Sequence, residues 1–438
     1  MLDDLQICYT SDVPPDLSLV REPQTKYRRS RAQTKLQLPG DSPALAPRIQ
    51  PARQLRTVGL FAGIGGLELG LASAGHRTLQ FCEIEPGARA VLAARFPKIE
   101  CAPDITKLDA LPARTELLVG GFPCQDLSQA GRTAGLAGKN SGLVSHVFRL
   151  IEHQRPRWLI LENVSFMLSL NKGQAMAAIL RELERLGYRW AYRVVDTRSF
   201  GLPQRRERVF IVASNDSDPR SVLFADDAGE DAVPVVGKGP SGYGFYWTEG
   251  IRGLGWGVDV VPTLKGGSTI GIGSPPAIWF PDGEPEIVKP DLRDAERMQG
   301  FDADWTKPAE EVTRKGHRWK LVGNAVTVNV AAWLGRRLAE PGSYDGGADQ
   351  AIPRGARWPR AAYNIGSGAC EADVTSWPLA EPRPRLRDFL QYEAVPLSAR
   401  GASGFLNRTE VSSLRFKPEF LKAVRRHLKS VLRSEARP

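Results

Sequence analysis

The chain has 438 residues, of which 42% are hydrophobic and 25% charged, and its formal net charge is +10. This length and apolar content allow two domains with separate cores, while the absence of an apolar run near the roughly 18 residues of a membrane span, or of a basic-then-apolar leader, argues against a membrane or secreted protein. The five cysteines form no CxxC pair, so we expect no disulfide framework, no zinc site and a reducing, cytoplasmic compartment.

The excess of basic residues lies at the two ends of the chain. Residues 1–56 hold nine Lys/Arg against six Asp/Glu, and residues 345–438 hold sixteen against ten, so the ends contribute +9 of the +10. Basic arms favour contact with a polyanion such as nucleic acid. A solvated, disordered extension is the equal alternative for residues 1–56, which are rich in proline and poor in large apolar residues.

From residue 57 to 213, short apolar runs alternate with segments of helical periodicity. In the helix expected at 174–186, five apolar residues share one face, and Gly187 supplies the stop. Alternating strands and helices predict a mostly parallel sheet with helices on both faces. Such a sheet binds ligands at the carboxyl ends of its strands. Four chemically notable residues fall there: Gly63, Glu83, Cys124 and Glu162.

The stretch FAGIGG, residues 61–66, follows the first expected strand and opens a helix. Its glycines allow a close approach of the backbone to a ligand. Glu83, at the end of the next strand, can accept hydrogen bonds from a ribose diol. Asp104, at the end of the third, is placed to hold an adenine amino group or, alternatively, to cap a turn. These features alone leave nicotinamide, flavin and S-adenosylmethionine open.

Cys124 lies in the stretch GFPCQ, a turn poor in core-forming residues. A structural cysteine normally sits in an apolar run, so this position indicates chemistry, although an isolated cysteine in a loop is usually inert. Residues 126–142 are rich in small side chains and predict a mobile loop. Within it lie two basic residues, Arg132 and Lys139, which in the simplest interpretation are solvated charges.

After residue 213 the periodicity is lost. Residues 237–273 hold twelve glycines interleaved with five aromatic residues, a composition that favours a loop-rich recognition surface over a flexible linker. Helical spacing returns at 324–340. In the last segment, 417–436, five apolar residues share one face with basic residues opposite: Phe420, Leu421, Val424, Leu428 and Val431.

Six motifs in one order carry a resemblance to a known family. The glycine turn, GFPCQ, LENV, QRRERVFIVAS, ERMQGF and LVGNAV resemble the DNA (cytosine-5)-methyltransferases of bacterial and phage type over residues 57–213 and 291–340, roughly half of the chain. The resemblance implies a Rossmann-like S-adenosylmethionine-dependent methyltransferase fold with a smaller, loop-rich target-recognition domain. The implied divisions are an arm at 1–56, a catalytic domain at 57–213 and 324–343, a recognition domain at 214–323, and an accessory extension at 344–438.

The resemblance also implies a covalent reaction. Carbon 5 of cytosine is a poor nucleophile, and addition of the Cys124 thiolate to carbon 6 would make it electron-rich. Glu162 would hydrogen-bond ring nitrogen 3 and the exocyclic amine, which requires a carboxyl that is protonated at least transiently. Arg206 or Arg208 would hold the ring carbonyl oxygen, with Gln204 positioning both. The cytosine would have to be rotated out of the duplex.

The remaining site residues follow from the same motifs. Pro123 is expected to stiffen the turn before the nucleophile. S-adenosyl-L-methionine is expected to meet Phe61, Ala62, Gly63, Ile64, Gly65, Gly66, Glu83, Ile84, Asp104, Ile105, Gly121, Pro123, Asn324 and Ala325. DNA is expected to meet Gln125, Ser128, Arg132, Lys139, Thr263 and Leu264. No metal is expected.

Double-stranded DNA is the implied partner of a monomer located in the cytoplasm, at the nucleoid of a bacterial or phage-infected cell, with a cognate restriction endonuclease acting separately. Two alternatives remain. A transfer-RNA cytosine-5 methyltransferase usually carries a Cys-Phe-Thr tripeptide, which this chain lacks. A catalytically silent DNA-binding module would have no reason to retain Cys124, Glu162 and Arg206. For residues 344–438, DNA binding and packing against the large domain are equal interpretations.

Overall fold

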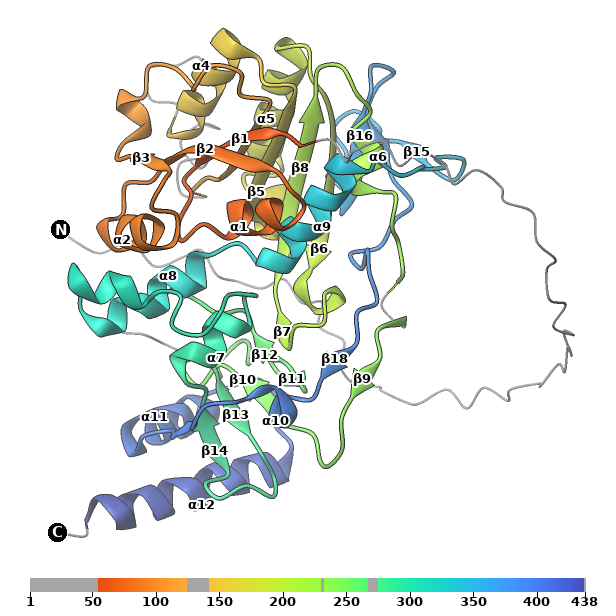
Figure 1. Cartoon of the computed structure of the whole chain (residues 1–438). Coiled ribbons are helices and arrows are strands. Elements are labelled where there is room, and N and C mark those ends of the chain that lie inside the picture. Colours follow the sequence, from red (N-terminus) through yellow and green to blue (C-terminus); the bar gives the residue numbers. More distant parts are fainter. Residues whose placement is uncertain (1–53, 124–141, 230–231, 267–274, 437–438) are drawn as a thin grey trace, which may run out of the picture. The chain divides into compact units, whose positions relative to one another are not determined.

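The computed structural model describes residues 54–123, 142–229, 232–266 and 275–436, all within one compact unit. A ten-stranded sheet forms its centre (Figure 1), in the order β15-β17-β16-β6-β8-β5-β4-β1-β2-β3. Its strands are β1 (Arg56–Leu60), β2 (Arg77–Cys82), β3 (Glu100–Ala102), β4 (Leu117–Gly121), β5 (Trp158–Val164), β6 (Arg189–Asp196), β8 (Glu207–Ser214), β15 (Gln350–Ala351), β16 (Ala361–Asn364) and β17 (Cys370–Glu371). None of the helices in these ranges has the length and apolar character needed to cross a bilayer.

The seven strands from β3 to β6 form the expected mostly parallel sheet. Strands β3, β2, β1, β4 and β5 pair in parallel, while β8 is antiparallel to both β5 and β6. Strand β6 therefore points the same way as the first five, and six of these seven strands share one direction. The prediction from alternating strands and helices is confirmed, because parallel neighbours require a crossover on a face of the sheet.

Helices cover both faces of this sheet. One hydrophobic cluster joins the strands to α4 (Val144–Gln154) and α5 (Gln174–Arg185). The other joins them to α1 (Gly66–Ser73), the short α6 (Arg220–Leu223) and α9 (Val328–Ala339). The helix predicted at 174–186 is confirmed, because its five apolar residues are buried and Gly187 follows with a left-handed φ of 78°.

The helix predicted at 324–340 begins later than expected. Helix α8 (Arg318–Asn324) ends where that helix was predicted to start, and α9 begins at Val328. Ala325 has an extended backbone, so residues 325–327 form a link between two helices rather than a first turn. Ala325 and Val326 of this link line the cavity described below. Helix α2 (Pro86–Arg95) and a 3-10 turn at Lys307–Glu311 pack beside α8.

A second sheet has five strands, four of which come from residues 243–289, between β8 and β15 of the first sheet. It contains β11 (Gly257–Val258), β10 (Tyr243–Phe245), β13 (Ala277–Trp279), β14 (Ile287–Lys289) and β19 (Val395–Pro396), in that order. Two pairs of short strands accompany it: β7 (Gln204–Arg205) with β12 (Val261–Pro262), and β9 (Val235–Val236) with β18 (Arg383–Pro384). Helix α7 (Leu292–Arg297) follows β14. The glycine- and aromatic-rich stretch is thus partly a small sheet with stacked rings, such as those of Tyr243 and Trp256.

The last hundred residues pack into both sheets. Strand β16 pairs antiparallel with β6 at the edge of the central sheet, and β19 pairs with β14 in the second. Three helices lie beside the second sheet in Figure 1: α10 (Leu386–Phe389), α11 (Ala399–Glu410) and α12 (Pro418–Glu435). Helices α11 and α12 are in contact with each other. The buried residues of α12 are Phe420, Ala423, Val424 and His427.

Phe420 is the centre of the aromatic core that α11 and α12 form with the second sheet. It is 1% exposed and lies 5.0 to 5.9 Å, between ring centroids, from the rings of Phe245, Trp256, Trp279 and Phe405. Loss of this ring leaves a cavity that its aromatic neighbours fill only in part. The C-terminal helices therefore depend on this side chain for their attachment.

We predict that Phe420→Ala lowers the free energy of unfolding by about 3–5 kcal/mol. The measurement is the urea midpoint followed by circular dichroism and by tryptophan fluorescence. Leu432→Ala is the control on the same helix, because Leu432 is 51% exposed, and we expect a change within about 0.5 kcal/mol. Equal effects of the two substitutions would contradict the packing described.

Candidate active site

A glycine turn, residues 61–66, leads from the end of β1 into α1. Gly63 and Gly65 have left-handed φ values of 55° and 84°, which favour glycine. At Gly66 the reason is space, because a Cβ atom there would lie 2.2 Å from the carbonyl oxygen of Val326. The turn is thus packed directly against the link between α8 and α9.

Glu83 fixes the shape of this turn. It follows β2, and its Oε2 accepts a hydrogen bond from the backbone N–H of Gly63 at 2.7 Å, while Oε1 accepts one from Glu85 at 2.7 Å. Burial raises the pKa of the Glu83 carboxyl, and the two backbone donors oppose that effect. The predicted hydrogen bonds to a ribose diol would add to these two and remain a prediction.

The glycine turn, the ends of two strands and the α8–α9 link enclose one small cavity. Seven predicted cofactor residues line it: Phe61, Ala62, Gly63, Gly66, Gly121, Asn324 and Ala325. The predicted catalytic residue Glu162 lines it as well, and so do Leu67 and Val326, which the motifs did not single out. Segments that are far apart in the sequence, from Phe61 to Val326, therefore meet at the carboxyl ends of β1, β4 and β5.

Glu162 is buried beside an arginine. Its Oε1 lies 3.1 Å from Nε of Arg208 on the neighbouring strand β8, and the two side chains are 10% and 16% exposed. Burial raises the pKa of the Glu162 carboxyl, and the charges of Arg208 and Arg206 act in the opposite direction. Burial and the neighbouring guanidinium groups therefore act in opposite directions on the protonation of this carboxyl group.

The chain before Cys124 runs alongside Glu162. In the β4–β5 pairing Gly121 lies opposite Glu162, and a Cβ atom on Gly121 would lie 2.9 Å from Oε2 of Glu162. Asn163 Nδ2 donates to the carbonyl oxygen of Phe122 at 3.0 Å, in a buried position. Asn163 belongs to the LENV motif, but nothing in the sequence alone indicated that it would hold the turn before the cysteine.

Arg206, one of the two arginines predicted to hold the cytosine carbonyl, is hydrogen-bonded to the backbone of three segments. This guanidinium, 2% exposed, donates from Nη1 to the carbonyl oxygens of Leu264 at 3.3 Å and Gly323 at 3.2 Å, and from Nη2 to that of Ala325 at 2.6 Å. Of the two arginines considered for the cytosine carbonyl, Arg208 is the one paired with Glu162. Arg206 has the geometry of a positioning residue.

Gln204 supports the same segments. Its Nε2 donates to the carbonyl oxygen of Met298 at 3.0 Å, and its Oε1 accepts from the backbone N–H of Leu264 at 3.0 Å. Leu264 was predicted to contact DNA, and this is corrected: its side chain is 2% exposed and packs in the core below the second sheet. Thr263 is half-buried, and its hydroxyl donates to the carbonyl oxygen of Arg205 at 2.7 Å.

Other predicted cofactor residues lie outside the wall of the cavity: Ile64, Gly65, Glu83, Ile84, Asp104, Ile105 and Pro123. Ile64 and Ile105 are buried in hydrophobic clusters, whereas Ile84 is 69% exposed. Asp104 acts as a cap, since its Oδ1 accepts from the backbone N–H and the hydroxyl of Thr106, and these hydrogen bonds lower the pKa of the Asp104 carboxyl. The alternative interpretation of Asp104 as a turn cap is thus observed.

Five predicted residues lie outside the described part of the chain: Cys124, Gln125, Ser128, Arg132 and Lys139. Their neighbours Pro123 and Gly142 are described, and Pro123 is exposed. Within the described ranges, no group of three or more His, Cys, Asp or Glu side chains could hold a metal ion.

Comparison with known proteins identifies relatives of this chain. The family model for C-5 cytosine-specific DNA methylase matches residues 55–232. Type II methyltransferase M2.BsuMI of Bacillus subtilis (strain 168) is 44% identical over 384 residues, which cover 85% of this chain and 98% of that protein. Type II methyltransferase M.DsaV of Dactylococcopsis salina is 28% identical over 65% of this chain and 86% of its own. Among solved structures, S. pombe Dnmt2 methyltransferase aligns with 66% of this chain and 99% of its own at a TM-score of 0.48 and 17% identity.

We predict that Arg208→Gln raises the pKa of Glu162 further, because the nearest cation that favours the carboxylate is removed. Infrared difference spectroscopy of the carboxyl band against pH measures this shift, with Glu162→Gln used to assign the band. Arg205→Gln is the matched control: Arg205 is exposed and belongs to the same motif, and we expect no shift from its loss. An equal shift in both variants would show that the pairing with Arg208 is not the cause.

Proposed function

Because this chain belongs to the family of C-5 cytosine-specific DNA methylases and is a DNA cytosine-5 methyltransferase, we propose that it methylates a cytosine rotated out of duplex DNA through a covalent bond to Cys124. The convergence on one cavity of the glycine turn, the end of β4 and Glu162, which is paired with Arg208, carries the proposal. The methyl donor proposed is S-adenosyl-L-methionine. Similarity to type II methyltransferases supports a role in a restriction–modification system.

Cys124 is proposed as the nucleophile because it follows closely in sequence on a residue that lies beside Glu162. Gly121 lies opposite Glu162, and Cys124 follows three residues later, so it lies within about 11 Å of Gly121 even when the chain is fully extended. A free thiol with a pKa of about 8.5 is only a few per cent thiolate at pH 7. Attack on carbon 6 therefore depends on a cytosine ring that the site polarises.

Glu162 and Arg208 would provide that polarisation. A protonated Glu162 donates to ring nitrogen 3, which withdraws electrons from carbon 6 while the thiolate adds, and Arg208 holds the ring carbonyl oxygen. Burial favours the protonated carboxyl, whereas the guanidinium of Arg208 keeps the carboxylate accessible. Proton transfer by a positioned group of this kind contributes roughly 10²–10⁴-fold to a rate. The Glu162 carboxylate can take the proton back from ring nitrogen 3 when the adduct breaks down, while the proton on carbon 5 leaves to a base as the bond between Cys124 and carbon 6 breaks.

The residues around the cavity fit S-adenosyl-L-methionine. Nothing lies within 4 Å of the position of a Cβ atom on Gly63, so a ligand can approach the backbone there. Glu83 would accept from the ribose hydroxyls, Asp104 from the adenine amino group, and the exposed Ile84 would cover the adenine ring. When bound, this cofactor supplies the electrophilic methyl group that the activated carbon 5 takes.

DNA recognition is proposed for residues 214–323. Carbon 5 and carbon 6 cannot be approached from above within a base stack, so the cytosine has to leave the duplex. The sheet of β10, β11 and β13 lies in this stretch, together with Thr263 next to the QRRER motif. Arg132 and Lys139, in the segment after Cys124, are proposed to meet the phosphates on either side of the rotated nucleotide.

We predict that the wild-type protein transfers a labelled methyl group to genomic DNA that lacks cytosine-5 methylation, and that Cys124→Ala does not. The variant should still bind DNA, because the substitution removes only the sulfur. Incorporation of label, followed by bisulfite sequencing, measures the reaction and its target sequence. Transfer RNA serves as the competing substrate. Label on RNA alone would overturn the DNA assignment, and equal label from both proteins would remove Cys124 from the mechanism.

We also predict a covalent complex with DNA in which cytosine is replaced by 5-fluorocytosine. Fluorine cannot leave carbon 5 as a proton does, so elimination stops and Cys124 remains bonded to carbon 6. A DNA–protein band that survives denaturing electrophoresis detects this complex, with Cys124→Ala and unsubstituted DNA as controls. If no such band forms while ordinary DNA is methylated, the reaction does not proceed by addition and elimination.

A further inference from the structure

Helix α12 carries two faces of opposite character. Its buried face holds Phe420, Ala423, Val424 and His427 against the second sheet and α11. On its other side, five basic residues fall within about a third of the helix circumference at 3.6 residues per turn: Lys422, Arg425, Arg426, Lys429 and Arg433. All five are exposed. The only acidic residues of the helix are Glu419 and Glu435, near its two ends.

Among the described residues, most of these charges have no anionic partner. Arg426 forms a bidentate pair with Glu286, at 2.8 and 2.9 Å. For the other four, no ion pair is found with any residue of the described ranges. We call Lys422, Arg425, Lys429 and Arg433 the α12 basic face. Like charges held on adjacent turns repel one another, so this face is stabilised when anions neutralise it.

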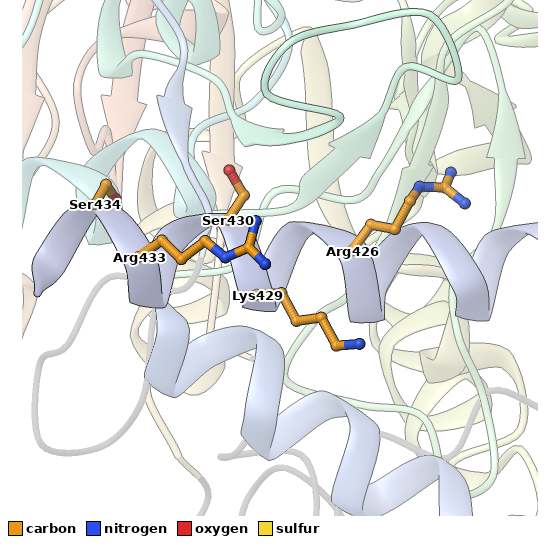
Figure 2. A pocket seen from close by; sticks show the side chains of 5 residues that line it. All are labelled: Arg426, Lys429, Ser430, Arg433 and Ser434. Carbon is orange, nitrogen blue, oxygen red and sulfur yellow. The ribbon is translucent and has the colours of Figure 1, made fainter.

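The basic residues also border a shallow depression. Figure 2 shows it along one side of α12, lined by Arg426, Lys429, Ser430, Arg433 and Ser434. Lysine, arginine and serine side chains are among the groups that contact DNA phosphates. From Lys422 to Arg433 the helix advances about 17 Å, with charges repeated on each turn. A row of this length matches several phosphates of a DNA strand.

We propose that the α12 basic face binds backbone phosphates of the duplex, outside the recognised sequence. The inference rests on the proposed function, because it takes the substrate to be duplex DNA. Helix α12 is attached to the proposed recognition domain: its contacts include β14, and Arg408 of α11 donates to the carbonyl oxygens of Trp247 at 2.6 Å and Glu249 at 3.1 Å. A phosphate contact made by α12 would therefore orient the recognition loops on the duplex.

Point substitutions test this better than deletion of residues after 343. Deletion would also remove β16 from the central sheet, β19 from the second sheet, and the partners of Phe245 and Trp279. The test protein is the full chain with Lys422→Gln, Lys429→Gln and Arg433→Gln. A matched control carries Lys172→Gln, Arg181→Gln and Arg189→Gln, three exposed basic residues at α5 and β6 for which no ion pair is found among described residues. Both variants have the same net charge.

We predict that the salt dependence of binding to a mixed-sequence duplex weakens in the α12 variant. Each lost phosphate contact reduces the slope of log Kobs against log salt by about 0.9, so three contacts reduce it by about 3. Fluorescence anisotropy over a salt series measures the slope, and the control variant should keep the wild-type value. The rate of methyl transfer at saturating DNA should not change, since none of these residues belongs to the site. Thermal unfolding checks that both variants are folded.

The outcomes separate this inference from the proposed function. An unchanged slope with intact DNA methylation would overturn the inference alone. A reduced slope in a protein that methylates no DNA would support the inference and overturn the function. Equal reductions of the salt slope in the α12 and control variants would show a general effect of net charge, and this result would also overturn the inference. Loss of binding to poly-glutamate, with no change in the slope for DNA, would assign the face to an acidic protein partner instead.

Discussion

The buried guanidinium of Arg206 is the contact on which the geometry of the site depends. A charge removed from water is costly unless hydrogen bonds replace its hydration. Here the replacement comes from three backbone carbonyl oxygens, of Leu264, Gly323 and Ala325, which lie 58 to 119 residues away in sequence. Arg206 directly precedes β8, the strand that carries Arg208, and so ties the start of β8 to the α8–α9 link. That link in turn presses Val326 against Gly66 and closes the cavity beside the glycine turn.

A second balance operates inside the cavity. Burial of Glu162 favours its neutral form, while Arg208 at 3.1 Å favours the charged form, and neither effect acts alone. A carboxyl in water would stay ionised at neutral pH, and one buried without a cation would stay protonated. Arg208 and Arg206 therefore have different partners although they are two residues apart: Arg208 pairs with the carboxyl group of Glu162, and Arg206 holds the backbone of Leu264, Gly323 and Ala325.

The sequence predicted the parts of the molecule whose signals are local. The five apolar residues of 174–186 fixed a helix and its buried face, and the order of the motifs identified most of the residues around the cavity. It could not separate Arg206 from Arg208, because both belong to one motif and their partners come from distant segments. It also placed Leu264 on a DNA surface and began the last helix of the catalytic region at 324. Both errors arise where tertiary contacts override local pattern: Leu264 is held in the core by Gln204, and residues 325–327 are held extended beside the glycine turn.

The C-terminal segment shows why packing and DNA binding need not be alternatives. Its strand β16 covers the edge of β6, and β19 covers the edge of β14, two edges that would otherwise present unpaired backbone groups. Helix α12 then packs through one side and exposes the other. A solvent-facing side that only aided solubility would need no more than scattered charges of both signs. Residues of one sign gathered opposite an aromatic core are costly in self-repulsion, and that cost is offset when the exposed side meets a polyanion while the buried side keeps its place on the second sheet.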